Sequence, residues 1–324
     1  MKKIISLLLA LILFAGVFAG CGGSKTDAPR KLSVVTTVFP LYDWVKNILG
    51  ENPAGAEITL LLDNGVDLHS YQATADDIIR ISSCDVFIYV GGESDRWVGD
   101  ALKEATNANM IVISLLEVPG FGAKEEEVKE GMQAEEEEED GEEEETEYDE
   151  HVWLSLKNAA LFTGVIRDAL MKADPGHAAA YSENADAYIK KLTALDEAYA
   201  AAVAAAPVKT ILFGDRFPFR YLTDDYGLDY YAAFVGCSAE SEASFETIAF
   251  LAGKVDELGL SAVLTLEGTD HKIAETVSAT AKTGPVKILS LDSMQSATAK
   301  DIQNGATYLS LMEKNLSVLK EALQ

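Results

Sequence analysis

The sequence predicts an α/β protein in which two mainly parallel-sheet α/β domains are joined by a long rigid helix. Two observations support this class. Strand-like and helix-like segments alternate from Lys31 onward and again from residue 208, and this order is typical of parallel sheets. Between the two series, residues 178–207 form an alanine-rich segment with helical spacing, which ends at Pro207.

The first series predicts four strands and three helices. Apolar, β-branched runs predict strands at "LSVVTTVFP", "EITLLLD", "VFIYVGG" and "MIVISLLE". Helical spacing predicts helices at "LYDWVKNILG", "TADDIIRISSCD" and "SDRWVGDALKEA", the last capped by Ser94. We therefore expect residues 31–123 to form an N-terminal domain, which a helix in residues 151–177 completes.

The second series follows the long helix. Strands are predicted at "KTILFG", "LDYYAAFVG", "SAVLTLEG" and "VKILSLDS". Helices are predicted at "FRYLTDDYG", "SFETIAFLAGKVDELG", "KIAETVSATAKTG" and "GATYLSLMEKNLSVLKEAL". Residues 208–324 are therefore expected to form the C-terminal domain.

The first 30 residues predict export and lipid anchoring. Two lysines, an apolar run that starts at Ile4 and the segment "AGCGGS" have the order of a signal peptide. The run is shorter than the roughly 20 apolar residues of a membrane-spanning helix. "FAGC" resembles the lipobox of bacterial lipoproteins, which implies a signal peptide at residues 1–20, acylation of Cys21 and a flexible tether at residues 21–30. We expect the body to be lipid-anchored at the extracytoplasmic face of the cell membrane.

A run of carboxylates interrupts the first series at residues 124–150. This segment contains 17 acidic residues and 2 lysines and so accounts for −15 of the net charge of −27. Because like charges without apolar periodicity repel one another and stay solvated, we expect a flexible acidic loop. The remaining chain has no basic patch to neutralise phosphates, which excludes nucleic acid as a partner.

Histidines are the clearest candidates for metal chemistry, because the chain contains only 4. His69 follows a predicted strand and His151 opens a predicted helix, and such positions in α/β sheets face the crevice where ligands bind. Taken singly, either histidine also fits a structural role. His177 and His271 are expected to be surface residues.

The residues around His69 and His151 resemble one known family. "VDLHSYQAT" is similar to the motif Asp-Pro-His-x-Tyr-x-Pro-Ser, with Leu68 in place of proline, and "DEHVWLSLKNA" is similar to Asp-Pro-His-Val-Trp-Leu-Asp-Pro, with Glu150 and Ser155 as departures. These motifs belong to the cluster A-I metal-binding lipoproteins, the substrate-binding components of zinc and manganese ABC transporters. Shorter matches extend the resemblance to the C-terminus.

This resemblance implies a metal site in a cleft between the two domains. His69 and His151 correspond to the first two ligands, and Asp292 corresponds to a carboxylate ligand from the second domain. The remaining ligand position holds Arg216, whose guanidinium has no lone pair to donate to a metal. Three residues of the same domain could replace it: Asp215, Glu240 and Cys237. Alternatively, three ligands and water hold the ion, or Arg216 pairs with Asp292 and the ligand is not a simple divalent ion.

Of these alternatives, we expect Arg216 to turn toward Asp215 or Glu240, and Glu240 to approach the metal. Imidazole and carboxylate ligands suit Zn²⁺ first and Mn²⁺ second. The resemblance implies an ABC permease as partner, and we expect a monomer. The acidic loop either collects cations or is a solvated spacer, and a disulfide between Cys84 and Cys237 is left open.

The sequence contains no motif of the common hydrolases or phosphate-binding enzymes: HExxH, GxSxG and a glycine-rich phosphate loop are all missing. We therefore expect a binding protein and not an enzyme. The alternative from another class is a cell-surface adhesin or interaction protein on the same scaffold, with a degenerate metal site.

Overall fold

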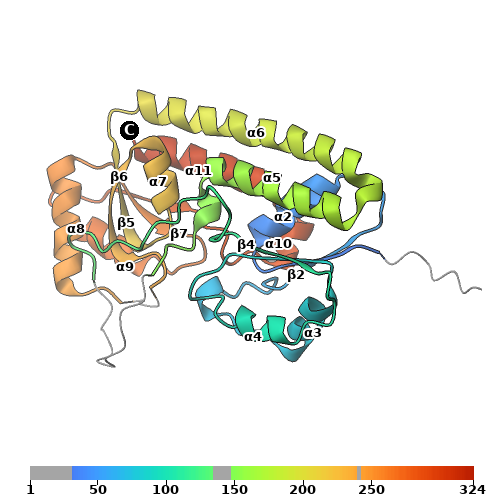
Figure 1. Cartoon of the computed structure of the whole chain (residues 1–324). Helices are drawn as coiled ribbons and strands as arrows, with labels where there is room; N and C mark the ends of the chain where they lie inside the picture. The colour runs from blue at the N-terminus through green and yellow to red at the C-terminus, as the bar shows by residue number, and fades with distance from the viewer. Residues whose placement is uncertain (1–30, 134–146, 239–241) are drawn as a thin grey trace, which may run out of the picture. The chain divides into compact units, whose positions relative to one another are not determined.

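The computed structural model describes residues 31–133, 147–238 and 242–324, and Leu32–Gln324 form one compact unit. This unit contains two four-stranded sheets whose strands are all parallel (Figure 1). The predicted α/β class with two parallel sheets is confirmed. The assignment of the sheets to two separate domains stays a prediction, and the predicted signal peptide, Cys21 and the tether lie outside the described residues.

The N-terminal sheet has the strand order β2-β1-β3-β4. Its strands are β1 (Ser33–Thr36), β2 (Glu57–Leu60), β3 (Val86–Tyr89) and β4 (Ile111–Ser114). Helices α2 (Phe39–Leu49) and α5 (Leu156–Ala173) pack on one face, and α3 (Ala75–Ser83) and α4 (Val98–Lys103) lie on the other (Figure 1). The first strand is shorter than predicted because Pro40 lies in the first turn of α2, where its fixed φ favours a helix.

The C-terminal sheet has the strand order β6-β5-β7-β8. Its strands are β5 (Thr210–Phe217), β6 (Asp229–Val235), β7 (Ala262–Leu266) and β8 (Lys287–Leu291). Helices α8 (Phe245–Leu258) and α9 (Lys272–Thr280) pack on one face, while α11 (Tyr308–Ala322) packs against β7 and β8. Two further helices of residues 208–324 are α7 (Arg220–Tyr226) and the short α10 (Ala299–Gln303), and the sequence analysis did not predict α10.

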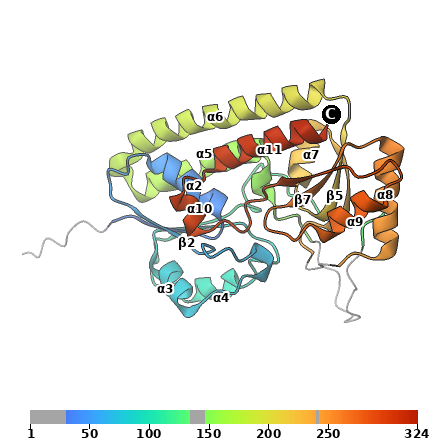
Figure 2. The same cartoon turned by 180° about the vertical axis from the view of Figure 1, so that it is seen from behind.

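The predicted long helix is α6 (Ala178–Ala205), and its 28 residues run along α5 and α11 (Figure 2). Buried tyrosines attach α6 to the N-terminal half of the unit, which contains the sheet β2-β1-β3-β4, and to the C-terminal half, which contains the sheet β6-β5-β7-β8. The Tyr188 hydroxyl donates to Asp43 Oδ2 in α2 over 3.4 Å, and the Tyr199 hydroxyl donates to the Met312 carbonyl in α11 over 2.6 Å. This one helix therefore packs on elements that accompany each of the two sheets.

Buried hydrogen bonds also join the two halves directly. Trp153 Nε1 donates to the Ser293 carbonyl over 2.9 Å, and the Tyr308 hydroxyl donates to the Trp153 carbonyl over 2.6 Å. The Tyr308 amide donates to Asp43 Oδ2 over 3.1 Å. Each bond contributes about 0.5–1.5 kcal/mol net, and their burial makes an unmatched partner costly. The halves are consequently held in a defined arrangement around one apolar core that draws on both sheets.

Within the described ranges, no helix combines the length and the apolar content that crossing a membrane requires.

Replacement by alanine is expected to change the free energy of unfolding in opposite directions at two glycines of the C-terminal half. A Cβ on Gly214 would lie 2.5 Å from Ala274 Cα in α9, so Gly214→Ala is expected to reduce the free energy of unfolding by about 1–3 kcal/mol through overpacking. A Cβ on Gly253, inside α8, meets nothing within 4 Å, so Gly253→Ala is expected to increase that free energy by about 0.5–1 kcal/mol. Urea denaturation of both variants measures the two effects, and equal shifts of one sign would contradict this packing.

Candidate metal centre

Two short turns of the same design position the paired histidines. His69 lies in the 3₁₀ turn η1 (Leu68–Ser70), and its amide donates to Asp67 Oδ1 over 3.0 Å. His151 comes directly before the 3₁₀ turn η2 (Val152–Leu154), and its amide donates to Asp149 Oδ1 over 2.8 Å. In both cases an aspartate two residues earlier accepts the bond, as in Asx turns. The repeated pattern Asp-x-His is therefore a local device that orients each histidine.

The two imidazole rings face each other through their Nε2 atoms, which are 3.2 Å apart. The opposite nitrogens are held by other side chains: His151 Nδ1 lies 2.9 Å from Asp149 Oδ1, and His69 Nδ1 lies 2.8 Å from Ser94 Oγ. His151 is fully buried. A carboxylate or hydroxyl on Nδ1 fixes the ring orientation of metal-ligating histidines and directs the Nε2 lone pair toward the ion. The pair has this support at Nδ1, and its two Nε2 atoms are within hydrogen-bonding distance of each other.

The surroundings shift the pKa values of the two histidines in opposite directions. Burial lowers the pKa of His69 to about 3, and His151 and Arg216 act in the same direction. Burial also lowers the pKa of His151, but the carboxylates of Asp149, Glu150 and Glu126 outweigh it and raise that pKa above its ordinary value. His69 is therefore neutral at physiological pH, and its lone pair is available to a cation.

A third potential ligand lies beside the histidine pair. One donor atom from each of His69, His151 and Cys237 lies within 4.8 Å of the others, and the part of the chain that the structure describes holds no second group of three such residues. Cys237 was one of the three replacements that the sequence left open for the position of Arg216. Cys84 and Cys237 do not form a disulfide, and Cys84 Sγ lies 3.5 Å from Met110 Sδ.

Arg216 lies close enough to His69 to lower its pKa, and its guanidinium pairs with a residue other than the two expected partners. Its Nη2 donates to Asp67 Oδ2 over 2.9 Å, and its Nη1 donates to the Ser238 carbonyl over 3.3 Å. The expected pairing with Asp215 is wrong. Asp215 Oδ2 accepts bonds from Thr265 and Leu266 at 2.8 and 3.2 Å, and Asp215 Oδ1 accepts the backbone amide of Arg216, not its guanidinium, at 2.9 Å. Glu240, the other expected partner and ligand, lies outside the described residues.

Asp292 is not part of the group that contains the histidine pair. Its Oδ1 accepts the Met294 amide over 3.0 Å. Nearby, Ser293 donates to both oxygens of Glu267 over 2.7 Å, and burial followed by the charge of Asp292 raises the pKa of Glu267 to about 7. Burial likewise raises the pKa of Asp292. Ligation of a metal by Asp292 or Asp215 stays a prediction.

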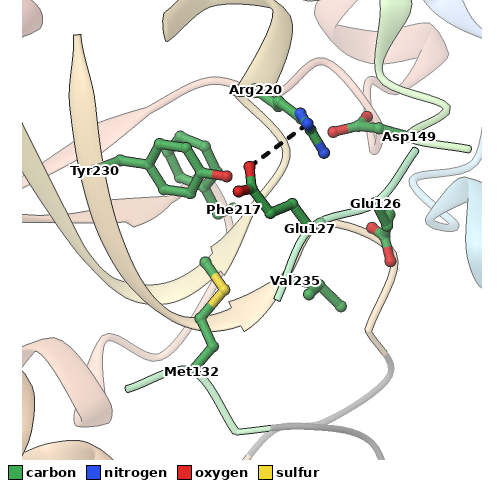
Figure 3. A pocket seen from close by; sticks show the side chains of 9 residues that line it. Glu126, Glu127, Met132, Asp149, Phe217, Arg220, Tyr230 and Val235 are labelled. Atoms are coloured by element: carbon green, nitrogen blue, oxygen red, sulfur yellow. Dashed lines mark ion pairs between the residues drawn. The ribbon is translucent and has the colours of Figure 1, made fainter. Parts of the chain in front are cut away.

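The described ends of the acidic segment are attached to the body beside this group. The Glu126 amide donates to the Glu147 carbonyl over 2.9 Å, and the Asp149 amide donates to the Lys124 carbonyl over 2.8 Å, so the two ends pair antiparallel. Figure 3 shows the pocket at this place, with Glu126 and Asp149 on its wall and Glu127 paired with Arg220 at 3.5 Å. Residues 134–146 lie outside the described residues, and the role of the acidic segment stays open.

Several residues of this centre were not identified as such from the sequence. Ser94 was expected to cap a helix, but α4 begins at Val98 with Trp97 before it, and the Ser94 hydroxyl contacts His69 instead. Glu126 was counted only as part of a solvated run, although its carboxylate accepts the Cys237 amide over 2.9 Å. The repeat "VDLH" and "YDEH" was the one local signal that could have identified Asp67 and Asp149 as supports of the histidines.

Comparison with known proteins identifies similar sequences along almost the whole chain. Residues 34–322 match the family described as zinc-uptake complex component A, periplasmic. The zinc-binding protein AdcA of Streptococcus pyogenes serotype M3 is 30% identical over 324 residues, which are 99% of this chain and 61% of the relative. The high-affinity zinc uptake system protein ZnuA of Bacillus subtilis is 30% identical over 312 residues, which are 94% of this chain and 93% of the relative.

A solved structure has the same fold. The Zn(II)-bound ZnuA-like domain of Streptococcus pneumoniae AdcA superposes with a TM-score of 0.70 at 30% identity, covering 91% of this chain and 99% of that chain. Since this chain spans 61% of the length of the streptococcal AdcA relative, the similarity concerns one part of that protein.

Proposed function

Because this chain belongs to the zinc-uptake complex component A family, we propose that it is a metal-binding receptor of an ABC importer that captures Zn²⁺ and delivers it to a membrane permease. Mn²⁺ is the alternative substrate ion. The protein acts by binding and not by catalysis, and it works as a monomer on the extracytoplasmic side of the membrane. The N-terminal sequence and the family description support this location.

The single observation that carries the proposal is the histidine pair. Two imidazoles bound to a tetrahedral Zn²⁺ at about 2.0–2.1 Å have their ligating nitrogens roughly 3.3–3.4 Å apart. The Nε2 atoms of His69 and His151 lie 3.2 Å apart before any ion is added. Little rearrangement is therefore needed for both to contact one ion, and the buried carboxylates of Asp149 and Glu150 balance its charge.

Equilibrium titration of the full chain with Zn²⁺ and with Mn²⁺ tests this function. We expect one tight site for Zn²⁺ per chain and weaker binding of Mn²⁺, because imidazole is a better ligand for zinc. Binding of neither ion would overturn the receptor proposal and would favour the adhesin alternative, in which the site is degenerate.

A substitution at Arg216 tests whether its charge opposes the ion. Arg216→His removes a guanidinium that lies near His69 and adds an imidazole at the family's ligand position, so we expect Zn²⁺ to bind about tenfold more tightly, roughly 1.4 kcal/mol. Arg216→Gln is the matched control, because it removes the charge without adding a ligand. Equal affinities of the two variants in calorimetric titration would show that residue 216 cannot reach the ion.

Lipid anchoring at Cys21 completes the proposed function. Cys21→Ser removes the acylated thiol, and stable anchoring needs acyl chains, so we expect this variant to appear in the soluble fraction after detergent-free washing of membranes. Immunoblotting of the two fractions measures the distribution. A variant that stays with the membranes would contradict the lipoprotein assignment.

A further inference from the structure

We propose that Cys237 supplies a thiolate as the third protein ligand of the substrate ion, so that two imidazoles and one sulfur hold it. This inference rests on the proposed receptor function and specifies the class of ion that the receptor accepts. The donor atoms of His69, His151 and Cys237 lie within 4.8 Å of one another. A Zn²⁺ ion with bonds of about 2.0 Å to nitrogen and 2.3 Å to sulfur holds such ligands roughly 3.3–3.6 Å apart, so a small approach of the sulfur completes the group.

The backbone on either side of Cys237 brings it to the histidine pair. Strand β6 ends at Val235, and Gly236 passes so close to the neighbouring groups that a Cβ there would lie 2.9 Å from the Phe217 carbonyl and 3.1 Å from the His151 ring. Only glycine allows this approach without displacement of the ring. The Cys237 amide is then fixed by Glu126 Oε1 at 2.9 Å. The backbone that carries the thiol is therefore held beside His151.

Arg216 connects the segment of Cys237 to the turn that carries His69. Its guanidinium joins Asp67, in the turn that carries His69, to the carbonyl of Ser238, the residue after Cys237. The residue at the family's ligand position thus connects the segments of two ligands and directs its charge toward a carboxylate. The guanidinium therefore links the turn of His69 to the segment of Cys237.

The surrounding charges suit a divalent cation, and the ion must be present for the thiol to ionise, because burial and the nearby carboxylates raise the pKa of Cys237. Asp149, Glu150 and Glu126 are buried or partly buried carboxylates around the group, and Glu150 Oε2 has no hydrogen-bond partner among the described residues. On binding, the divalent ion takes the place of the thiol proton: a metal–sulfur bond forms, the S–H bond breaks and the proton passes to solvent. Oxidation or reduction of the sulfur is not involved.

A thiolate ligand favours borderline and soft metal ions over hard ones. Sulfur ligands favour Zn²⁺ and Cd²⁺ over Mn²⁺, Mg²⁺ and Ca²⁺, which prefer oxygen. We therefore infer that the receptor accepts borderline and soft divalent ions and discriminates against Mn²⁺ by more than a site of imidazoles and carboxylates alone would.

Cobalt spectroscopy of the full chain tests the sulfur ligand directly, because bound Co²⁺ gives visible ligand-field bands with any donors and an intense near-ultraviolet charge-transfer band only with thiolate. We expect both bands in the wild type, with Zn²⁺ displacing the Co²⁺. Cys237→Ser is expected to lose the charge-transfer band while it keeps the ligand-field bands, and Cys84→Ala, the control for the other buried thiol, is expected to keep both. In competition titrations Cys237→Ser is expected to bind Zn²⁺ about 10–100-fold more weakly while its Mn²⁺ affinity changes by less than about threefold.

The outcomes separate this inference from the function on which it rests. Ligand-field bands without a charge-transfer band in the wild type would overturn the sulfur ligand and leave the metal receptor intact, even if the Cys237→Ser variant failed to fold. A charge-transfer band that survives in a folded Cys237→Ser variant would also overturn it. The absence of any cobalt or zinc binding to the wild type would overturn the receptor function itself.

Discussion

The His151→Ala variant is expected to bind Zn²⁺ about 100-fold more weakly than the wild type, a loss of roughly 2.7 kcal/mol. His151 is fully buried, and its ring is held by Asp149, so its removal takes away one of the two facing Nε2 atoms and leaves Asp149 with only the backbone amide of residue 151. Loss of a supporting contact alone costs metal sites 10–100-fold in affinity, and the loss of a ligand costs at least as much. Calorimetric titration with Zn²⁺ measures the change.

His177→Ala is the matched control for this variant. His177 is a partly exposed histidine that pairs with Asp174 at 2.7 Å on the turn before α6, and it is not in the group of potential ligands. We expect its substitution to leave the Zn²⁺ dissociation constant unchanged within about twofold, or roughly 0.4 kcal/mol. If His151→Ala bound Zn²⁺ as tightly as this control, the histidine pair would not be the metal site.

Trp153→Ala is expected to lower the free energy of unfolding by about 3–5 kcal/mol, the largest stability effect that we predict. The indole is fully buried and donates to the Ser293 carbonyl, and the Trp153 carbonyl accepts the Tyr308 hydroxyl. Its removal leaves a cavity and an unpaired carbonyl at the place where the two halves meet. Chemical denaturation followed by circular dichroism measures the loss.

Phe245→Ala serves as the control for the tryptophan variant, because Phe245 is a large aromatic residue that is 92% exposed. Its substitution is expected to change the free energy of unfolding by no more than about 0.5 kcal/mol. A loss below about 1 kcal/mol in Trp153→Ala would mean that the two halves do not depend on this contact for their stability.

The acidic segment at residues 124–150 is not a solvated insertion along its whole length. A run of glutamates indicated a solvated insertion, but residues 124–133 and 147–150 at its two ends hydrogen-bond with each other and with the C-terminal sheet. Glu126 contacts Cys237, and the Gln133 amide donates to the Ala233 carbonyl in β6 over 2.9 Å. Composition describes the average hydration of a segment, whereas an individual carboxylate is retained in the interior when a specific donor compensates its burial.

Local sequence patterns determined the fold class and the identity of the histidine pair. Apolar periodicity and the lengths of the segments predicted the alternating strands and helices and the long α6, because these properties depend on neighbouring residues in the chain. The two Asp-x-His turns are also local, since each aspartate accepts a bond from an amide two residues later. Asp67 and Asp149 were therefore present in motifs that could be read directly, whereas Ser94, which contacts the His69 ring, was not.

Only the tertiary structure decided which distant residues meet around that pair. Arg216 pairs with Asp67, which is 149 residues away, and Glu126 holds Cys237 across 111 residues. The order of the strands and the position at which each strand ends decide these contacts, and no periodicity in the chain specifies either of them. A candidate such as Asp215 was plausible by sequence distance, but it lies at an irregularity of β5, and its carboxylate is bound by Thr265 and Leu266 because β7 lies next to β5 in the sheet.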